Sequence, residues 1–176
     1  MKNNKSFEEM TVTERKLAIC YDVIDSINQN ELKCVSDGTG YILYSRNVQN
    51  NLNRNDDNLI SKEDVKELKN NCSVCARGAM LLSRIDKFNK LTWSDVWDSQ
   101  SATSKGLKDI FTEHELSMIE NAFERNMING SYANNDLTQK LVSAVKFGKK
   151  CSDDNKKRLV QIMQNIIYNN GKVVLQ

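Results

Sequence analysis

The sequence contains no proline and only seven glycines in 176 residues, where average composition would supply about nine prolines and about a dozen glycines. The absence of proline excludes collagen-like, proline-rich linker and mucin-like chains. No stretch approaches 18 uninterrupted apolar residues, so we expect no membrane span. The first residues are polar and lack the apolar segment of a secretory signal, so the predicted location is the cytoplasm.

The sequence also lacks the short motifs that mark common active sites. Neither glycine-rich phosphate-binding pattern occurs, and there is no G-x-S-x-G nucleophile motif, E-x-x-H pair or EF-hand spacing. His114 is the only histidine, and its place opposite an apolar helix stripe predicts a solvated surface residue. The acidic face carrying Glu120 and Glu124 is also expected to be solvated. These absences predict a protein that uses no cofactor and is not an enzyme.

Charge of neither sign dominates, because 25 Lys and Arg oppose 23 Asp and Glu for a net charge of +2. Nothing in this balance favours nucleic acid or a membrane surface as a partner. The five cysteines are an odd number and predict reduced thiols in a cytosol. Eighteen lysines against seven arginines, together with 22 asparagines, are typical of an AT-rich genome and indicate a low-GC bacterium or one of its phages.

Helical periodicity dominates the chain. Thr11 with Glu14, and Thr112 with Glu115, have the form of capping boxes that begin helices, and Ser61 is expected to begin another. In the first helix Asp22 and Asp25 fall away from the centre of the apolar face. Apolar spacing predicts about six main helices and a short one, beginning after Thr13 and covering 62–69, 72–88, 91–98, 112–127, 136–147 and 153–169.

The helix predicted over 72–88 has the widest apolar face, an arc of about 160°, so we expect it to be the central buried helix. Arg77, Arg84 and Lys87 fall on its opposite face. Two β-forming runs in Leu32–Ser45 flank Asp37-Gly38-Thr39-Gly40 and predict an antiparallel hairpin, to which the C-terminal residues could add a third strand. The predicted fold is therefore a helix-dominated α+β single domain over 1–176, with a flexible asparagine-rich loop at 47–58.

Cys72 and Cys75 form a C-x-x-C pair at the start of that helix. A thiol there would meet the positive end of the helix, which lowers its pKa, so a redox pair or half of a zinc site are two functional interpretations. A redox pair typically follows a strand, and a structural zinc site needs four ligands, whereas the other three cysteines are scattered. The plainer interpretation makes Cys75 a small core residue.

The segment Lys146–Arg158 is the most basic part of the chain, and it spans a predicted helix end, a loop and the next helix start. It could contact phosphates, although no aromatic residues interleave with its charges as in single-strand binding. A lysine-rich helix end also matches the dipole of its own helix. Its candidate nucleic-acid contacts are Lys146, Lys149, Lys150, Lys156, Lys157 and Arg158.

A protein-binding surface is predicted around four residues: Met80, Arg84, Trp93 and Trp97. The two tryptophans lie four residues apart, so a short helix would align them, and tryptophan is enriched among interface anchors. Met80 falls on the polar side of its helix. The alternative is that the tryptophans pack between helices in the core.

Two stretches, Asn71–Ile85 (NCSVCARGAMLLSRI) and Met118–Glu124 (MIENAFE), resemble a pattern in small uncharacterised phage and bacterial proteins. The resemblance implies a single α-rich domain and transfers no catalytic residue. With it, the sequence predicts a phage-encoded interaction module that binds a host or phage protein in the host cytoplasm, for example as an inhibitor of host defence. The alternatives are nucleic-acid or nucleotide binding through Lys146–Arg158 and a zinc-stabilised module through Cys72 and Cys75.

Overall fold

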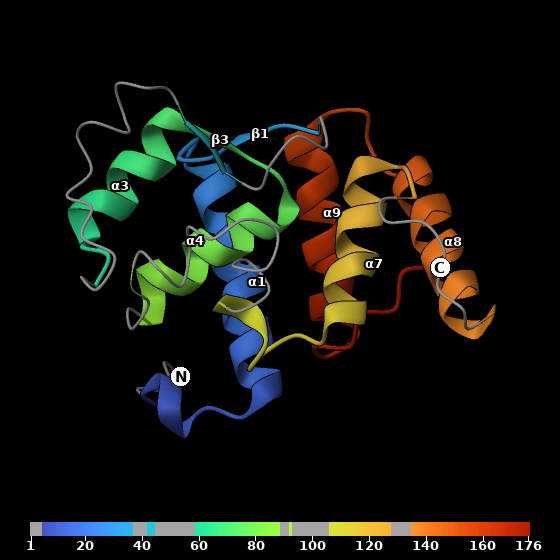
Figure 1. Cartoon of the computed structure of the whole chain (residues 1–176), viewed down its shortest axis with the longest axis horizontal. Coiled ribbons are helices and arrows are strands. Elements are labelled where there is room, and N and C mark those ends of the chain that lie inside the picture. The colour runs from blue at the N-terminus through green and yellow to red at the C-terminus, as the bar shows by residue number, and fades with distance from the viewer. Residues whose placement is uncertain (1–4, 37–41, 45–58, 89–91, 93–105, 128–134) are drawn as a thin grey trace.

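The computed structural model describes residues 5–36, 42–44, 59–88, 92, 106–127 and 135–176. The described part of the chain is helix-dominated, with a small sheet beside the helices (Figure 1). In order, its elements are the 3-10 helix η1 (Phe7–Glu9), α1 (Val12–Asn28), β1 (Lys33–Cys34), β2 (Ile42–Tyr44), α3 (Lys62–Asn71), β3 (Cys72–Val74), α4 (Ala76–Phe88), α7 (Glu113–Glu124), α8 (Asn135–Lys150) and α9 (Asn155–Tyr168).

The helix starts predicted from capping residues are confirmed. Thr11 begins α1, Ser61 begins α3 and Thr112 begins α7, and each side chain accepts a hydrogen bond from the backbone amide three residues later. In each case the backbone amide of the capping residue donates in turn to the carboxylate of the acidic residue at that position. These reciprocal bonds satisfy amides that have no partner inside the helix.

The antiparallel hairpin prediction is wrong, because β1 and β2 do not pair with each other. β3 lies between them: β1 runs parallel to β3, with Cys34 opposite Val74, and β2 runs antiparallel to β3. The third strand therefore comes from residues 72–74, and the C-terminal residues 172–176 form no strand. The predicted turn at 37–40, the loop at 47–58 and nearly all of the short helix at 91–98 lie outside the described residues.

The central helix is confirmed, but it begins at Ala76 and not at Cys72. α4 contacts α1, α3 and α7, while α7 packs along α8 and α1 packs along α9. Figure 1 shows α9, α7 and α8 side by side, with α1 passing behind α4. Because α4 has neighbours on several sides, its first eight residues are all buried. No described helix combines the length and apolar character needed to cross a bilayer.

Because neighbours surround α4 on several sides, a charged side chain of this helix is buried as well. The Arg77 side chain is only 3% exposed, and its guanidinium pairs with Glu113 at 3.0 Å and Glu120 at 2.9 Å, both on α7. Arg77 and Glu120 therefore face each other between α4 and α7. Their predicted placement on solvated faces is wrong. Burial raises the pKa of Glu120, and the Arg77 charge opposes that rise. Removing one partner of such a pair typically costs about 3–5 kcal/mol.

Three of the described helices in this proline-free chain are followed by a residue in the left-handed conformation. Asn30 after α1, Arg125 after α7 and Asn170 after α9 all have positive φ. After α9 the next residue, Gly171, has φ +81° and donates its amide to the Ile166 carbonyl at 2.8 Å. Asparagine and glycine tolerate this conformation better than other residues, so they end helices here without proline.

The contact between α7 and α8 depends on Gly148. A Cβ atom at this position would lie 1.8 Å from the Ala122 carbonyl oxygen, which belongs to the backbone of α7. Two backbones therefore meet without an intervening side chain, as small residues permit. No sequence pattern indicated this contact.

We predict that Gly148→Ala lowers the free energy of unfolding by about 2 kcal/mol or more, because the helices must separate to admit the methyl group. Elsewhere in a helix the same change normally stabilises by up to ~1 kcal/mol. Urea denaturation measures the difference. The control is Gln139→Ala on the exposed side of α8, expected to change stability by less than about 0.5 kcal/mol. An unchanged or higher stability for Gly148→Ala would contradict the packing described.

Candidate functional site

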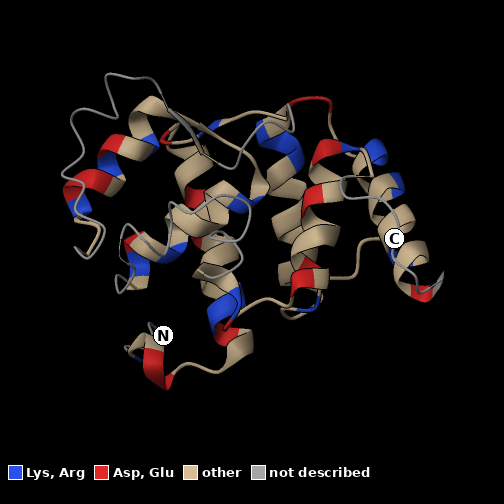
Figure 2. Ribbon diagram, viewed as in Figure 1, with Lys and Arg blue, Asp and Glu red and all other residues tan. Residues whose placement is uncertain are grey.

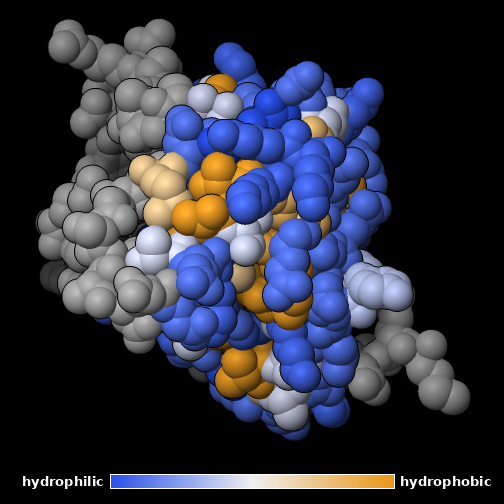
Figure 3. All heavy atoms as spheres, turned by 90° about the vertical axis from the view of Figure 1, so that its right-hand side faces the viewer, coloured by the Kyte–Doolittle hydropathy of each residue, from blue (hydrophilic) through white to orange (hydrophobic). Residues whose placement is uncertain are grey.

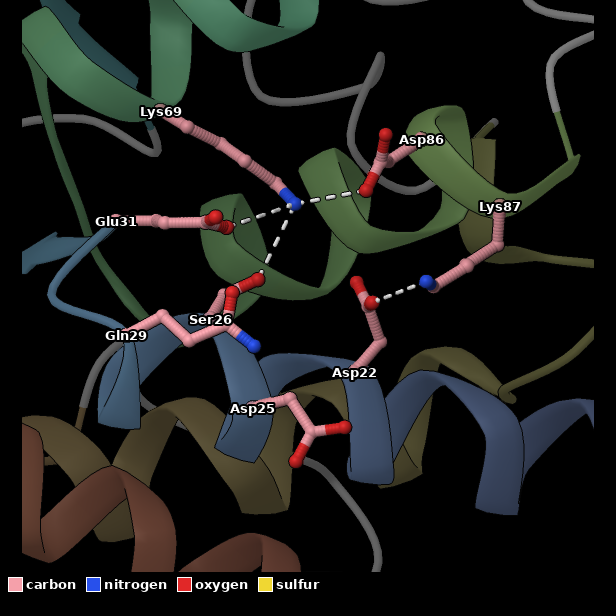
Figure 4. A pocket seen from close by; sticks show the side chains of 8 residues that line it. All are labelled: Asp22, Asp25, Ser26, Gln29, Glu31, Lys69, Asp86 and Lys87. Carbon is pink, nitrogen blue, oxygen red and sulfur yellow. Dashed lines mark hydrogen bonds and ion pairs between the residues drawn. The ribbon is translucent and has the colours of Figure 1, made fainter.

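A polar pocket of about 180 Å³ opens between α1, α3 and α4. Figure 4 shows that its side chains come from three segments that are distant in sequence, and that the Asp25 carboxylate is directed away from the ion pairs of Lys69 and Lys87. The residues that line it are Asp22, Asp25, Ser26, Gln29, Glu31, Lys69, Asp86 and Lys87. All are polar, and six of the eight carry a charge.

Lys69 enters the pocket from the end of α3 and is only 8% exposed. Its ammonium donates to the Asp86 carboxylate at 2.8 Å and to the Ser26 hydroxyl at 3.1 Å, and it lies 3.7 Å from the Glu31 carboxylate. Figure 4 shows these contacts linking α3 to α1 and α4. The three donors of this ammonium are therefore matched by acceptors of the protein itself.

Asp22 enters from α1 and is 7% exposed. Its Oδ1 accepts from the Lys87 ammonium at 2.9 Å, whereas Oδ2 is buried and has no hydrogen-bond partner. The Lys87 side chain is half exposed, at 51%. The pKa of Lys87 is raised, first by its hydrogen bond to Asp22, with partial burial opposing the rise and the charges of Asp86 and Asp25 adding to it.

The pocket carries net negative charge, because four carboxylates face two ammonium groups. Asp25 on α1 is exposed, and its carboxylate makes no hydrogen bond or ion pair with the described residues, although its backbone carbonyl accepts from the Gln29 amide. The pocket therefore has two places where acceptor capacity is unused: one oxygen of buried Asp22 and the carboxylate of Asp25. A buried oxygen without a donor costs about 1–3 kcal/mol, which a bound donor would recover.

A metal ion is not what this arrangement favours. Each lysine ammonium already pairs with a carboxylate of the pocket. No group of three or more His, Cys, Asp or Glu side chains within the described ranges could hold a metal ion. The chemistry that fits the unused acceptors is a cationic group with several N–H donors.

The predicted protein-binding residues do not form one surface in the described part of the chain. Met80 is fully buried in the core, so its placement on a polar side was wrong: α4 has neighbours there too. The Arg84 side chain is 13% exposed and binds Asp109 and the Gly106 carbonyl, which joins α4 to the segment before α7. Trp93 and Trp97 lie outside the described residues.

Apolar surface is present elsewhere. Figure 3, which looks at the molecule from the α8 side, shows apolar strips between hydrophilic rows. The large apolar side chains that are exposed in the described ranges are Val12, Tyr21, Leu59, Met127, Val142, Tyr168 and Val174. Nothing in the structure indicates what would cover them, so the polar pocket is the better-defined site.

Cys72 and Cys75 are both buried, the first on β3 and the second between β3 and α4. Burial raises the pKa of Cys75 to about 12, although backbone amides at the start of α4 act in the opposite direction. The predicted lowering by the helix N-terminus is therefore wrong, because desolvation of the thiolate outweighs it. Neither cysteine forms a disulfide bond, and neither do Cys20, Cys34 and Cys151.

The basic segment is divided between two helices. Lys146, Lys149 and Lys150 are exposed on the last turns of α8, and Lys157 is exposed on α9. Lys156 is partly buried and donates to Asn30 at 3.2 Å. Figure 2 shows that the connection between the two helix ends is acidic.

Arg158, the last residue of that segment, makes its hydrogen bonds within the protein and is not a cation available at the surface. Its side chain is buried, and its Nε donates to the Phe123 carbonyl at 2.7 Å. The same guanidinium donates to the carbonyls of Ser152 and Asp153 and to the Ser36 hydroxyl. It therefore ties the start of α9 to the end of α7 and to the segment after β1.

His114 is partly buried, and both ring nitrogens are inaccessible and have no hydrogen-bond partner. The prediction of a solvated histidine is therefore wrong, because α7 packs along α8 at this point. Burial lowers the pKa of His114, and the nearby charge of Lys140 lowers it further. The ring nitrogens do not line the pocket between α1, α3 and α4.

Comparison with known protein families, with curated proteins and with solved structures gave no match. The resemblance of two short segments noted above therefore gains no support from whole-chain similarity. The fold and the pocket rest on their own geometry.

The pocket was not identified from the sequence. Asp22, Ser26 and Gln29 follow one another at helical spacing along α1, which is the one local signal of a polar stripe. Asp25 and Glu31 come from the same helix and the residues just after it, and the rest of the pocket comes from the end of α3 and the last turn of α4. Only the packing of the three helices brings these stripes together.

We predict that stability falls as pH rises above 9, because the buried thiols ionise only in the unfolded chain. The ordinary thiol pKa of 9.0 rises to about 12 for Cys20 and Cys75 and to about 11 for Cys34. Stability from these thiols is fully present below pH 9 and is lost as pH rises toward the folded values, by about 1 kcal/mol per thiol per pH unit.

Urea denaturation under reducing conditions from pH 8 to pH 10 measures this slope, and Cys75→Ala should remove one thiol's share of it. Cys151→Ala, at the least buried thiol, is the control and should change the slope less. If Cys75 were instead a low-pKa thiolate, stability would not fall with pH through this residue, and Cys75→Ala would leave the slope unchanged or steeper.

Proposed function

We propose that this protein is a non-enzymatic interaction module that binds a partner protein, with the pocket between α1, α3 and α4 as part of its contact surface. The observation that carries the proposal is the buried oxygen of Asp22, which has no donor at the edge of an open, negatively charged pocket. Buried polar groups are nearly always hydrogen-bonded. An acceptor left without a donor at a surface opening is therefore a place where a partner can contribute binding energy.

The composition supports the kind of partner. A proline-free chain rich in asparagine and lysine is typical of an AT-rich genome, and this supports a phage or low-GC bacterial origin and a host or phage protein in the cytoplasm as the target. Inhibition of a host protein by occupying its surface is the mode of action we propose.

We predict that immobilised full-length protein retains a specific protein from lysate of a low-GC bacterium, and that Asp22→Asn loses it. The matched control is Asp136→Asn, because Asp136 is an exposed carboxylate on α8 whose loss changes net charge equally. Quantitative mass spectrometry compares the three samples. Retention by all three proteins would exclude the pocket from the interface, and recovery of nucleic acid without any specific protein would overturn the proposal.

Nucleic-acid binding is a second candidate, favoured by the exposed lysines at the end of α8. Lys146, Lys149 and Lys150 lie on one side of the helix at spacings of three and four residues. Such a row could follow a phosphate backbone. Arg158 is buried, and the connection that follows α8 is acidic. This surface therefore carries fewer available cations than the sequence indicated.

If this second function holds, replacing both Lys146 and Lys150 with glutamine should make the negative slope of log affinity against log salt shallower by about 2. This is close to one unit per lost phosphate contact. The control replaces Lys62 and Lys66, an exposed pair with the same spacing on α3. Fluorescence anisotropy with labelled DNA and RNA at several salt concentrations measures the slope. Absent binding, or equal effects of the two double variants, would reject the second function.

A further inference from the structure

The Asp22–Lys87 pair has the geometry of an occupied cation site. Lys87 places its ammonium 2.9 Å from Oδ1 of Asp22, and Figure 4 shows the Asp22 carboxylate directed from α1 into the space beside α4. A point donor such as an ammonium satisfies only one of the two carboxylate oxygens here, and the other has no partner. The Lys87 ammonium therefore occupies the site but satisfies only one of the two Asp22 oxygens.

A guanidinium would match this carboxylate better than an ammonium does. Its planar fork of N–H donors can bond both oxygens of one carboxylate at once. Asp25 lies three residues along the same helix, and its negative charge acts on the Lys87 ammonium, so it would also attract a guanidinium in that place. The remaining net negative charge of the pocket also favours a cation over a neutral or anionic group.

Lys87 is the side chain that can yield its place. It is 51% exposed, whereas Lys69 is 8% exposed and bonded to two other residues at short distance. The Lys87 side chain can return to water because it is already half exposed, and a cation that takes its place keeps the buried Asp22 carboxylate paired. The pocket can thus exchange an internal cation for an external one while Lys69 continues to join the three helices.

We propose that the pocket binds an arginine side chain of the partner protein, whose guanidinium takes the place of the Lys87 ammonium on Asp22. This assignment rests on the proposed function, because it names the chemistry through which that partner is recognised. It also predicts opposite effects for two neighbouring charges. Removing a carboxylate should weaken binding, and removing Lys87 should strengthen it.

The experiment titrates full-length protein with N-acetyl-arginine methylamide, and follows amide shifts by NMR. The neutral isostere N-acetyl-citrulline methylamide is the matched ligand control. We expect the arginine compound to bind at least about tenfold more tightly, because charge-assisted bonds to a carboxylate are worth more than neutral ones. Equal affinity of the two compounds would overturn the proposal.

Three variants make the test independent of folding defects at Asp22. Asp25→Asn should weaken the arginine compound severalfold, because it removes an exposed carboxylate that has no structural bond. Lys87→Gln should strengthen it severalfold, which a purely structural lysine would not do. Asp136→Asn on α8 should leave it unchanged. Weaker or unchanged binding by Lys87→Gln would overturn the exchange of cations.

Two further probes test whether the cation belongs to a protein side chain, to a small molecule or to a metal ion. Propylguanidine carries the same single guanidinium charge without a peptide backbone, and tighter binding of propylguanidine than of the arginine compound would assign the site to a small guanidinium compound and overturn a protein side chain as its ligand. Displacement of the arginine compound by millimolar Mg²⁺ would overturn it in favour of a metal. Loss of a captured partner with Asp22→Asn, combined with no binding of the arginine compound, would refute this inference and leave the interaction function standing.

Discussion

The burial of α4 is the constraint on which the rest of the structure depends. A helix with neighbours on several sides must either be apolar throughout or supply partners for each charge it carries. α4 is not apolar throughout, and its charges are matched by different neighbours: Arg77 by α7, Arg84 by the segment before α7, Asp86 by α3 and Lys87 by α1. Each charge of α4 thus fixes the position of one surrounding element.

This constraint also explains where the pocket lies. The first eight residues of α4 are buried, and its last turn emerges between α1 and α3. There the matching becomes looser, since Lys87 is half exposed and its partner Asp22 retains one oxygen without a donor. A pair that only held the helices together would gain by satisfying both oxygens, as buried polar networks usually do. The pocket is the place where the matching of α4's charges is left incomplete.

Local features of the fold were predictable, and features that need distant segments were not. The starts of α1, α3 and α7 follow from a Ser or Thr and an acidic residue three positions later, because both partners lie in one turn. The sheet did not follow, because β3 comes from a segment far along the chain and separates the two strands expected to form a hairpin. Residues 72–74 are too short a run for periodicity to distinguish a strand from the start of a helix.

The same distinction applies to the candidate site residues. Periodicity assigns a helix one buried and one solvated face, so it placed Met80 and Arg77 outside, whereas several neighbours of α4 bury both. The start of a helix lowers the pKa of an exposed thiol, but Cys75 is buried, and desolvation, which depends on the whole fold, raises its pKa by more.

Asp22 shows the limit most clearly. Its sequence neighbourhood places it beside an apolar stripe, and nothing local distinguishes a solvated carboxylate from one buried against a lysine 65 residues later. What distinguishes them is the imbalance of donors around the carboxylate, which exists only once α1 and α4 have packed together. An acceptor without a donor destabilises the folded protein by a small amount in every molecule. A ligand that supplies the donor recovers that energy, and this couples binding at the pocket to the stability of the contact between α1 and α4.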